Sequence, residues 1–250
     1  MNATELADLL TDELRAVARP ERAEQEKRYL KSGLAFLGAS VWEIRRVMQA
    51  FVKGATPLDH DRLVPLVEAL WEPPIHERRM AAVALLELHA ELLSTRDLPL
   101  VERLLRQSKT WALVDGLAAH VVGGILVRQP KETTAVLDRW AADPDFWIRR
   151  SSLLAELLPV RGGAELAPFL RRADAMLEEK EFFIRKAIGW VLREVGKRRP
   201  DEVADWLAPR THRASGVTMR EAVRYLPASS AERLMQAYRE KRPATSGETE

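Results

Sequence analysis

The chain of 250 residues contains no cysteine, and none of its apolar runs reaches the length needed to cross a bilayer. The lack of cysteine excludes disulfides, thiolate zinc ligands and a cysteine nucleophile, and it fits a reducing compartment. The N-terminus is polar and acidic, unlike a signal peptide. We therefore expect a cytoplasmic protein without a membrane partner.

Sequence patterns typical of metal and cofactor chemistry are missing as well. The pairs Gly123-Gly124 and Gly162-Gly163 lack the strand and the motif that surround a phosphate-binding loop. No segment alternates polar and apolar residues over a sustained length, so we expect essentially no sheet. The histidines show no metal-ligand spacing, and we expect neither a metal nor a cofactor. They are His60, His76, His89, His120 and His212.

The composition is that of a globular protein, with 46% hydrophobic and 30% charged residues. The length allows a sizeable core, in one large domain or in a stack of small units. The formal net charge is only +2, although the sequence pI is near 9.0. Overall charge therefore points only weakly to a polyanionic partner, and the placement of the basic residues must decide.

Apolar residues recur at helical spacing along nearly the whole chain, with proline or glycine between the segments. The first predicted helix covers residues 2–19 and stops at Pro20. A second, highly charged helix is predicted over residues 21–31, and a break follows at residues 33–38. Helix then follows helix to the end of the ordered chain.

Six segments beyond this break share one pattern, in which a bulky apolar residue precedes a charged residue by four positions. The segments are Trp42–Arg46, Ile75–Arg79, Trp111–Asp115, Phe146–Arg150, Phe182–Lys186 and Val217–Glu221. Their last residues lie 33 to 36 positions apart. A period in the middle thirties, with two helices per unit, is typical of α-solenoids of the HEAT or armadillo kind.

We therefore predict an all-α fold, an α-solenoid of HEAT-like helical repeats with a concave, positively charged groove. Stacking buries the one apolar face of each repeat, and the six segments are expected in the helices that line the concave side. The predicted organisation is a single repeat domain over residues 1–240, with N-terminal helices in 1–38 and repeats in 39–240. The tail 241–250 lacks apolar residues and is predicted to be disordered.

Four of the six segments place a base at the same position, and we call these residues the basic row: Arg46, Arg79, Arg150 and Lys186. One interpretation is structural, because an arginine there can donate hydrogen bonds to neighbouring helix ends and acids. For any single base we favour this interpretation. For the row as a whole, a phosphate backbone is an equally good interpretation, because duplex DNA presents a regular array of anions.

Asp115 interrupts the basic row, and on a helix it shares a face with Trp111 one turn earlier. It is either a solvated acid beside a packed tryptophan or an acid held ready for a cationic ligand. A surface that binds only phosphate gains nothing from an acid, which favours the second interpretation. Trp190 lies four residues after Lys186, on the same predicted face. We assign four other tryptophans to packing between helices: Trp42, Trp71, Trp140 and Trp206.

Three stretches resemble the DNA alkylation repair family, and in particular its HEAT-like alkylpurine DNA glycosylases of the AlkD type. The stretches are Lys109–Asp115, Phe146–Arg150 and the longer Glu181–Glu194. The resemblance extends from about Tyr29 to Tyr225 and is weaker in the N-terminal third of the chain.

The resemblance implies a catalytic set of two tryptophans, one aspartate and one arginine, which fall on Trp111, Trp190, Asp115 and Arg150. The implied activity is monofunctional excision of cationic N3- or N7-alkylated purines from duplex DNA, without base flipping and without a lyase step. The expected form is a monomer, associated with the nucleoid when bound to DNA. The DNA-binding candidates are Arg46, Arg79, Lys109, Trp147, Arg149, Arg150, Arg185 and Lys186.

The repeat pattern alone leaves other functions open, because most stacks of this kind are scaffolds. One alternative is a non-catalytic solenoid that binds DNA or a protein partner. Another is a protein that recognises branched DNA, as is the case for relatives that keep the fold and lose the glycosylase residues. Retention of Asp115 argues against placing this chain with those relatives.

Overall fold

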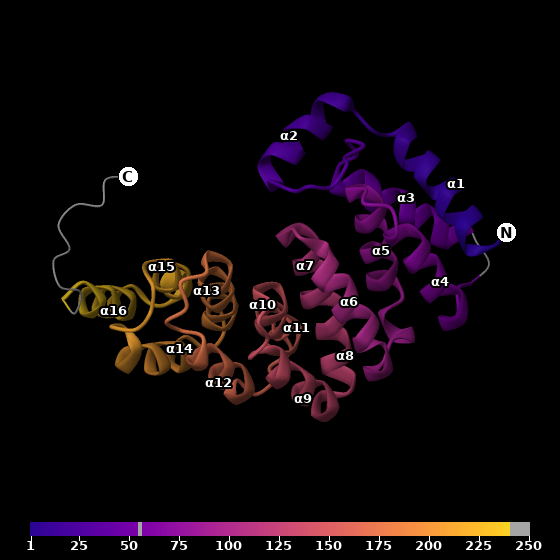
Figure 1. Cartoon of the computed structure of the whole chain (residues 1–250). Helices are drawn as coiled ribbons and strands as arrows, with labels where there is room; N and C mark the ends of the chain where they lie inside the picture. The colour runs from indigo at the N-terminus through magenta and orange to yellow at the C-terminus, as the bar shows by residue number, and fades with distance from the viewer. Residues whose placement is uncertain (55–56, 241–250) are drawn as a thin grey trace. The chain divides into compact units, whose positions relative to one another are not determined.

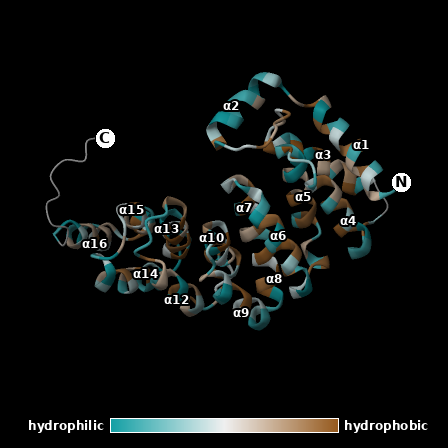
Figure 2. Cartoon of the chain, viewed as in Figure 1, coloured by the Kyte–Doolittle hydropathy of each residue, from teal (hydrophilic) through white to brown (hydrophobic). Residues whose placement is uncertain are grey.

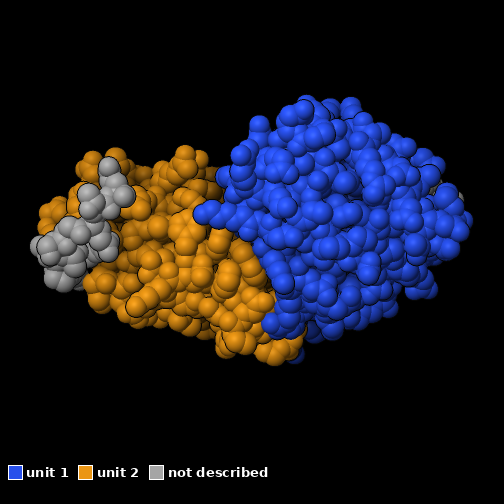
Figure 3. Space-filling model, turned by 45° about the horizontal axis from the view of Figure 1, so that its top comes forward, with its two compact units in different colours: residues 1–133 blue, residues 134–250 orange. Residues whose placement is uncertain are grey.

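The computed structural model describes residues 1–54 and 57–240, and Figure 1 shows the helices in chain order. The predicted tail 241–250 lies outside the described residues. By internal contacts the chain divides into two compact units, Met1–Thr133 (unit 1) and Thr134–Glu250 (unit 2), which Figure 3 colours separately. Each unit contains several of the predicted repeats.

Unit 1 is built from helices that begin near the residues predicted from the sequence. They are α1 (Ala3–Ala16), α2 (Pro20–Leu30), α3 (Val41–Gly54), α4 (His60–Trp71), α5 (His76–Leu88), the 3-10 turns η1 (Ala90–Leu92) and η2 (Thr95–Asp97), α6 (Leu98–Ser108), α7 (Trp111–Gly116), η3 (Leu117–Val122) and α8 (Gly123–Arg128). Helix α9 (Pro130–Trp140) crosses into unit 2. Proline is the first residue of both α2 and α9. The first amides of a helix have no partner within the helix, so the missing N–H of proline costs no hydrogen bond there.

Unit 2 continues the helical chain. They are α10 (Phe146–Leu154), α11 (Leu157–Arg161), α12 (Ala167–Ala175), α13 (Phe182–Gly196), α14 (Pro200–Leu207), the 3-10 turns η4 (Ala208–Arg210) and η5 (Val223–Tyr225), α15 (Gly216–Ala222) and α16 (Ala228–Glu240). Side-chain caps fix several helix starts: Asp145 accepts a hydrogen bond from the Trp147 amide, and Glu181 accepts one from the Phe183 amide.

The predicted repeats are present. The six segments open α3, α5, α7, α10, α13 and α15. Within unit 1, α3 packs on α5 and α5 on α7; within unit 2, α10 packs on α13 and α13 on α15. No strand forms in the described residues, where a single isolated β-bridge joins Ala35 to Ile75. The all-α solenoid of helical repeats is therefore confirmed.

The repeat helix α13 buries one apolar stripe. In α13 the side chains of Ile184, Ile188 and Leu192 are completely buried at helical spacing, while Phe182 at its first turn stays exposed. Full burial of an aliphatic side chain of this size stabilises the fold by roughly 1.5–3 kcal/mol. Stacking of such stripes forms the core of each unit.

The loop between α2 and α3 is held by a buried carboxylate. Glu77 in α5 is fully buried and accepts hydrogen bonds from the amides of Leu37 and Gly38 at 2.9 and 2.6 Å. Gly38 has a φ of 103°, and a Cβ there would lie 2.0 Å from the Arg19 carbonyl oxygen. Only glycine fits this position, which explains the predicted break in the helical pattern.

Helix α2 buries few of its residues. Figure 2 shows it mainly in hydrophilic colours, and only Ala23 and Leu30 are buried along its length. Tyr29, near the end of α2, nevertheless contacts Trp111 on α7, the helix that carries Asp115.

Residues Trp111–Arg128 form one continuous helix from α7, η3 and α8. The middle segment η3 is π-helical, and such segments are rare and often lie at functional sites. This helix of 18 residues, with a mean hydropathy of 1.4, is long and apolar enough to span a membrane by length and composition. The expectation that no apolar run reaches that length is therefore wrong, but 61% of the window is buried inside the protein, as in a central core helix.

We expect Gly189→Ala to lower the free energy of unfolding by about 1–3 kcal/mol, the usual cost of overpacking. A Cβ at Gly189 would lie 2.6 Å from the Glu221 Cβ and 3.0 Å from the Thr218 carbonyl oxygen, so α13 and α15 would have to separate. Urea unfolding followed by circular dichroism measures the change. Gly54→Ala is the control, because a Cβ there meets nothing within 4 Å. Equal stability of the two variants would contradict the close packing.

Candidate functional site

Trp111 and Asp115 both lie on α7, one turn apart. Both are partly exposed, whereas Leu113 and Val114 between them are completely buried. The short helix therefore presents the indole and the carboxylate on one accessible side and anchors itself by the other. This is the arrangement that the four-residue spacing predicted.

Tyr29 lies beside this tryptophan, although sequence analysis did not single it out. Its ring makes an edge-to-face contact with Trp111, with 6.0 Å between centroids and an interplanar angle of 88°. Tyr29 is 72% exposed, so the contact forms at the surface of unit 1. The partners are far apart in sequence, and only the fold brings the end of α2 to α7.

A second carboxyl group approaches the same helix. Gly116 has no side chain, and a Cβ there would lie 2.8 Å from a Val83 methyl group and 3.1 Å from Glu87 Oε1. The Glu87 carboxylate pairs with Arg45 at 3.3 Å, and burial raises its pKa. The small residue after Asp115 thus lets α5 and its acid come close to α7. Sequence analysis missed Glu87, because nothing in its local pattern marks it.

In unit 2, Arg150 and Trp190 occupy α10 and α13. Trp190 is partly exposed. Arg150 is only 3% exposed, its Nη1 donates to the Phe183 carbonyl oxygen, and its guanidinium lies 5.7 Å from the centre of the Phe183 ring. This arginine therefore ties the middle of α10 to the first turn of α13.

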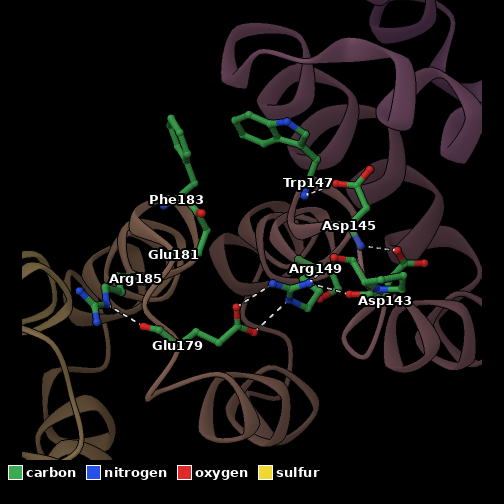
Figure 4. A network of polar contacts seen from close by, with 10 residues as sticks. Asp143, Asp145, Trp147, Arg149, Glu179, Glu181, Phe183 and Arg185 are labelled. Atoms are coloured by element: carbon green, nitrogen blue, oxygen red, sulfur yellow. Dashed lines mark hydrogen bonds and ion pairs between the residues drawn. The ribbon is translucent and has the colours of Figure 1, made fainter.

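Aromatic rings gather at the starts of α10 and α13. Trp147 and Phe183 lie 4.8 Å apart between ring centroids and project to the same side in Figure 4. Phe146 contacts both rings, and Phe182, which is 53% exposed, meets Phe183 edge-on. Sequence analysis named Trp147 as a DNA-binding candidate and overlooked the phenylalanines, which it used only to mark repeat starts.

The family model for DNA alkylation repair enzymes matches residues 10–226, most of the chain. The chain belongs to the DNA alkylation repair enzyme family. The match includes α7, α10 and α13, which carry the four predicted catalytic residues.

Two solved structures share the fold of this DNA alkylation repair family member. A predicted DNA alkylation repair enzyme from Enterococcus faecalis superposes with a TM-score of 0.76 at 22% identity, over 84% of this chain and 97% of that one. The Pseudomonas fluorescens alkylpurine DNA glycosylase AlkC, bound to DNA containing an abasic site analog, gives 0.54 at 16% identity, over 94% and 68%. Among curated protein sequences, none matches significantly.

Most bases at the repeat starts of this family member have internal partners. Arg79 donates to the carbonyl oxygens of Trp71 and Gln107, at the ends of α4 and α6. Arg149 forms a two-pronged ion pair with Glu179, and Arg185 donates to the Glu179 carbonyl (Figure 4). These contacts support the structural interpretation that we favoured for single bases.

Lys186, the last residue of the basic row, also has an internal partner. Lys186 pairs with Glu221, the acid that stands where the next repeat would carry a base, and Arg193 pairs with the same carboxylate. These neighbours hold the pKa of Glu221 below its usual value although burial alone would raise it. The acid at Glu221 is thus explained by an ion pair between successive repeats.

The tryptophans assigned to packing are buried with one exception. Trp71, Trp140 and Trp206 are 2%, 1% and 9% exposed, which confirms their assignment. Trp42 is 67% exposed, so its assignment was wrong. It lies in the first turn of α3, on the solvent side, where the Arg46 guanidinium covers its ring at 4.9 Å.

Two of the histidines, His60 and His76, pack against other side chains. His60 Nε2 lies 2.7 Å from Asp97 Oδ1, and His76 is stacked on Phe36 at 4.7 Å between ring centroids. Burial lowers the pKa of His76 to about 4, so the ring stays neutral near pH 7. Across residues 1–54 and 57–240, no group of three or more His, Asp or Glu side chains is placed to hold a metal ion.

We expect Arg150→Ala to lower the free energy of unfolding by about 1–3 kcal/mol, because the partly buried Phe183 carbonyl loses a donor and the ring loses its cationic neighbour. Thermal and urea unfolding measure the change. The control is Arg220→Ala in α15, whose side chain is exposed. If Arg150→Ala unfolds like wild type, the contact with α13 is not structural.

Proposed function

We propose that this protein is a monofunctional DNA glycosylase that removes cationic N3- or N7-alkylated purines from duplex DNA without flipping the base. Family membership supports a function in DNA alkylation repair. The observation that carries the finer proposal is the pair of Trp111 and Asp115 on α7, both partly exposed, at a position where four other repeats carry a base.

The chemistry follows from the charge of the lesion. An N3- or N7-alkylated purine is positively charged and already a good leaving group. When the N-glycosidic bond breaks, its electron pair neutralises the purine, and the deoxyribose gains oxocarbenium character. Water then adds to the anomeric carbon, loses a proton, and leaves an abasic site. The protein must stabilise a sugar cation and orient water, with little need to protonate the base.

Asp115 would supply the negative charge that stabilises this cation and orients the water, as carboxylates do in glycoside hydrolysis. Trp111 would pack its ring face against the deoxyribose, because aromatic faces attract positive charge. The same role for Trp190, which lies in unit 2, stays a prediction. Tyr29 joins this set as a support for Trp111, since its ring meets that indole edge-on. The contact between Arg150 and a DNA phosphate stays a prediction.

We expect Asp115→Asn to slow release of 7-methylguanine from methylated duplex DNA by about 10²–10³-fold under single-turnover conditions, the usual effect of removing one electrostatic stabiliser of a transition state. DNA affinity should persist, because an anion contributes nothing to phosphate binding. Released base is measured by chromatography, and affinity by fluorescence anisotropy.

Asp205→Asn is the matched control, an exposed acid in α14. Unchanged excision kinetics in Asp115→Asn would remove Asp115 from the mechanism. Absence of base release by the wild-type protein, together with tighter binding to a DNA junction than to a linear duplex, would instead favour a non-catalytic binder of branched DNA.

A further inference from the structure

A pocket of about 390 Å³ opens on unit 1 beside the start of α7. It lies between the loop that follows α2 and the end of α6. Its polar and charged lining consists of Ser32, Arg79, Arg106, Gln107 and Lys109, and no acidic residue lines it. A hollow lined by three cationic side chains without a carboxylate is suited to an anion.

Arg79 is the most buried of the three bases that line this pocket. It is 8% exposed, and its Nε and Nη1 donate to the Trp71 and Gln107 carbonyl oxygens at 3.1 and 2.7 Å. No carboxylate forms an ion pair with it in the part of the chain that the structure describes, and burial lowers its pKa. A desolvated charge with neutral partners only is costly, and a bound anion would offset that cost.

Lys109 adds a charge that the fold leaves available. It closes α6 in the left-handed conformation, with φ 49° and ψ 21°, and its side chain is exposed. Among the described residues its ammonium group forms no ion pair. Arg106, the third base, pairs with Glu102 at 2.6 Å and contributes less.

We propose that this pocket binds a phosphodiester group of the DNA backbone, held by Lys109 and Arg79 with Arg106 at the rim. The proposal rests on the proposed function only in taking duplex DNA as the partner. Phosphate suits the site because it accepts hydrogen bonds from several donors at once and stays anionic at neutral pH.

The pocket lies next to the predicted catalytic residues of α7, so a phosphate bound in it would position the DNA. Lys109 precedes Trp111 by two residues, so their Cα atoms lie within about 7 Å of each other. A phosphate held at Lys109 would fix the deoxyribose of a neighbouring nucleotide next to the indole and one helical turn from Asp115. In this arrangement the protein binds the DNA backbone, so the damaged base needs no pocket of its own.

The test compares wild type with Lys109→Asn, which removes the charge and tolerates the left-handed backbone. Binding of an undamaged fluorescent duplex is titrated at several salt concentrations. We expect the slope of log affinity against log salt to fall in magnitude by about 0.9, the value for one lost phosphate contact. Lys109→Arg should keep the wild-type slope. Lys131→Asn, an exposed lysine at the start of α9, is the matched control.

A second arm separates the backbone from free phosphate. Thermal unfolding is measured in inorganic phosphate and in sodium chloride of equal ionic strength. A fall in slope for Lys109→Asn but not for Lys131→Asn supports the proposal. An unchanged slope overturns it, and so does a Lys109-dependent stabilisation by inorganic phosphate without a change in slope.

Base release separates this proposal from the proposed function. A wild-type protein that releases no base contradicts the proposed function, while the slope comparison still decides the fate of the pocket.

Discussion

Arginine side chains that donate to carbonyl groups at helix ends join neighbouring repeats within each unit. The last carbonyls of a helix have no partner in their own helix and must find a donor elsewhere. Arg78 and Arg79 supply donors to the end of α4, and Arg79 also reaches the end of α6. Each such guanidinium sets the distance and direction of the next helix, so the packing of the repeats depends on these bases.

Because these bases are held in place by the packing, only part of the positive charge of the protein is available to a polyanion. A base that holds two helices together has little freedom to follow a DNA strand, and it can offer only a charge in a fixed place, as Arg79 does at the proposed phosphate pocket. The charge available to a polyanion comes instead from exposed bases such as Lys109 and Arg46, which occupy different elements of unit 1. In the proposed function, an acid on α7 and cations beside it would serve the two opposite charges of a single substrate, a cationic base on an anionic backbone.

The sequence predicted the fold closely, because a period of 33 to 36 residues and the apolar stripes are visible without any long-range information. It also identified the shared face of Trp111 and Asp115, since that depends on helical spacing alone. It could not find Tyr29 or Glu87, which reach α7 from α2 and α5 through tertiary packing. It misassigned Trp42 because a tryptophan at a helix start looks the same whether its neighbours cover it or not.

The π-helical segment η3 lies directly after Asp115 and Gly116. A π-turn holds one more residue than an α-turn, and each residue of an α-helix advances the chain by about 100° around its axis. Losing that additional residue would straighten the ladder of hydrogen bonds but rotate α7 by roughly a quarter-turn relative to α8. With α8 anchored in the core, the indole and the carboxylate would then face a different direction. The direction in which Asp115 points thus depends on the number of residues in η3. Deletion of one residue there would turn the carboxylate away while every proposed functional side chain is kept.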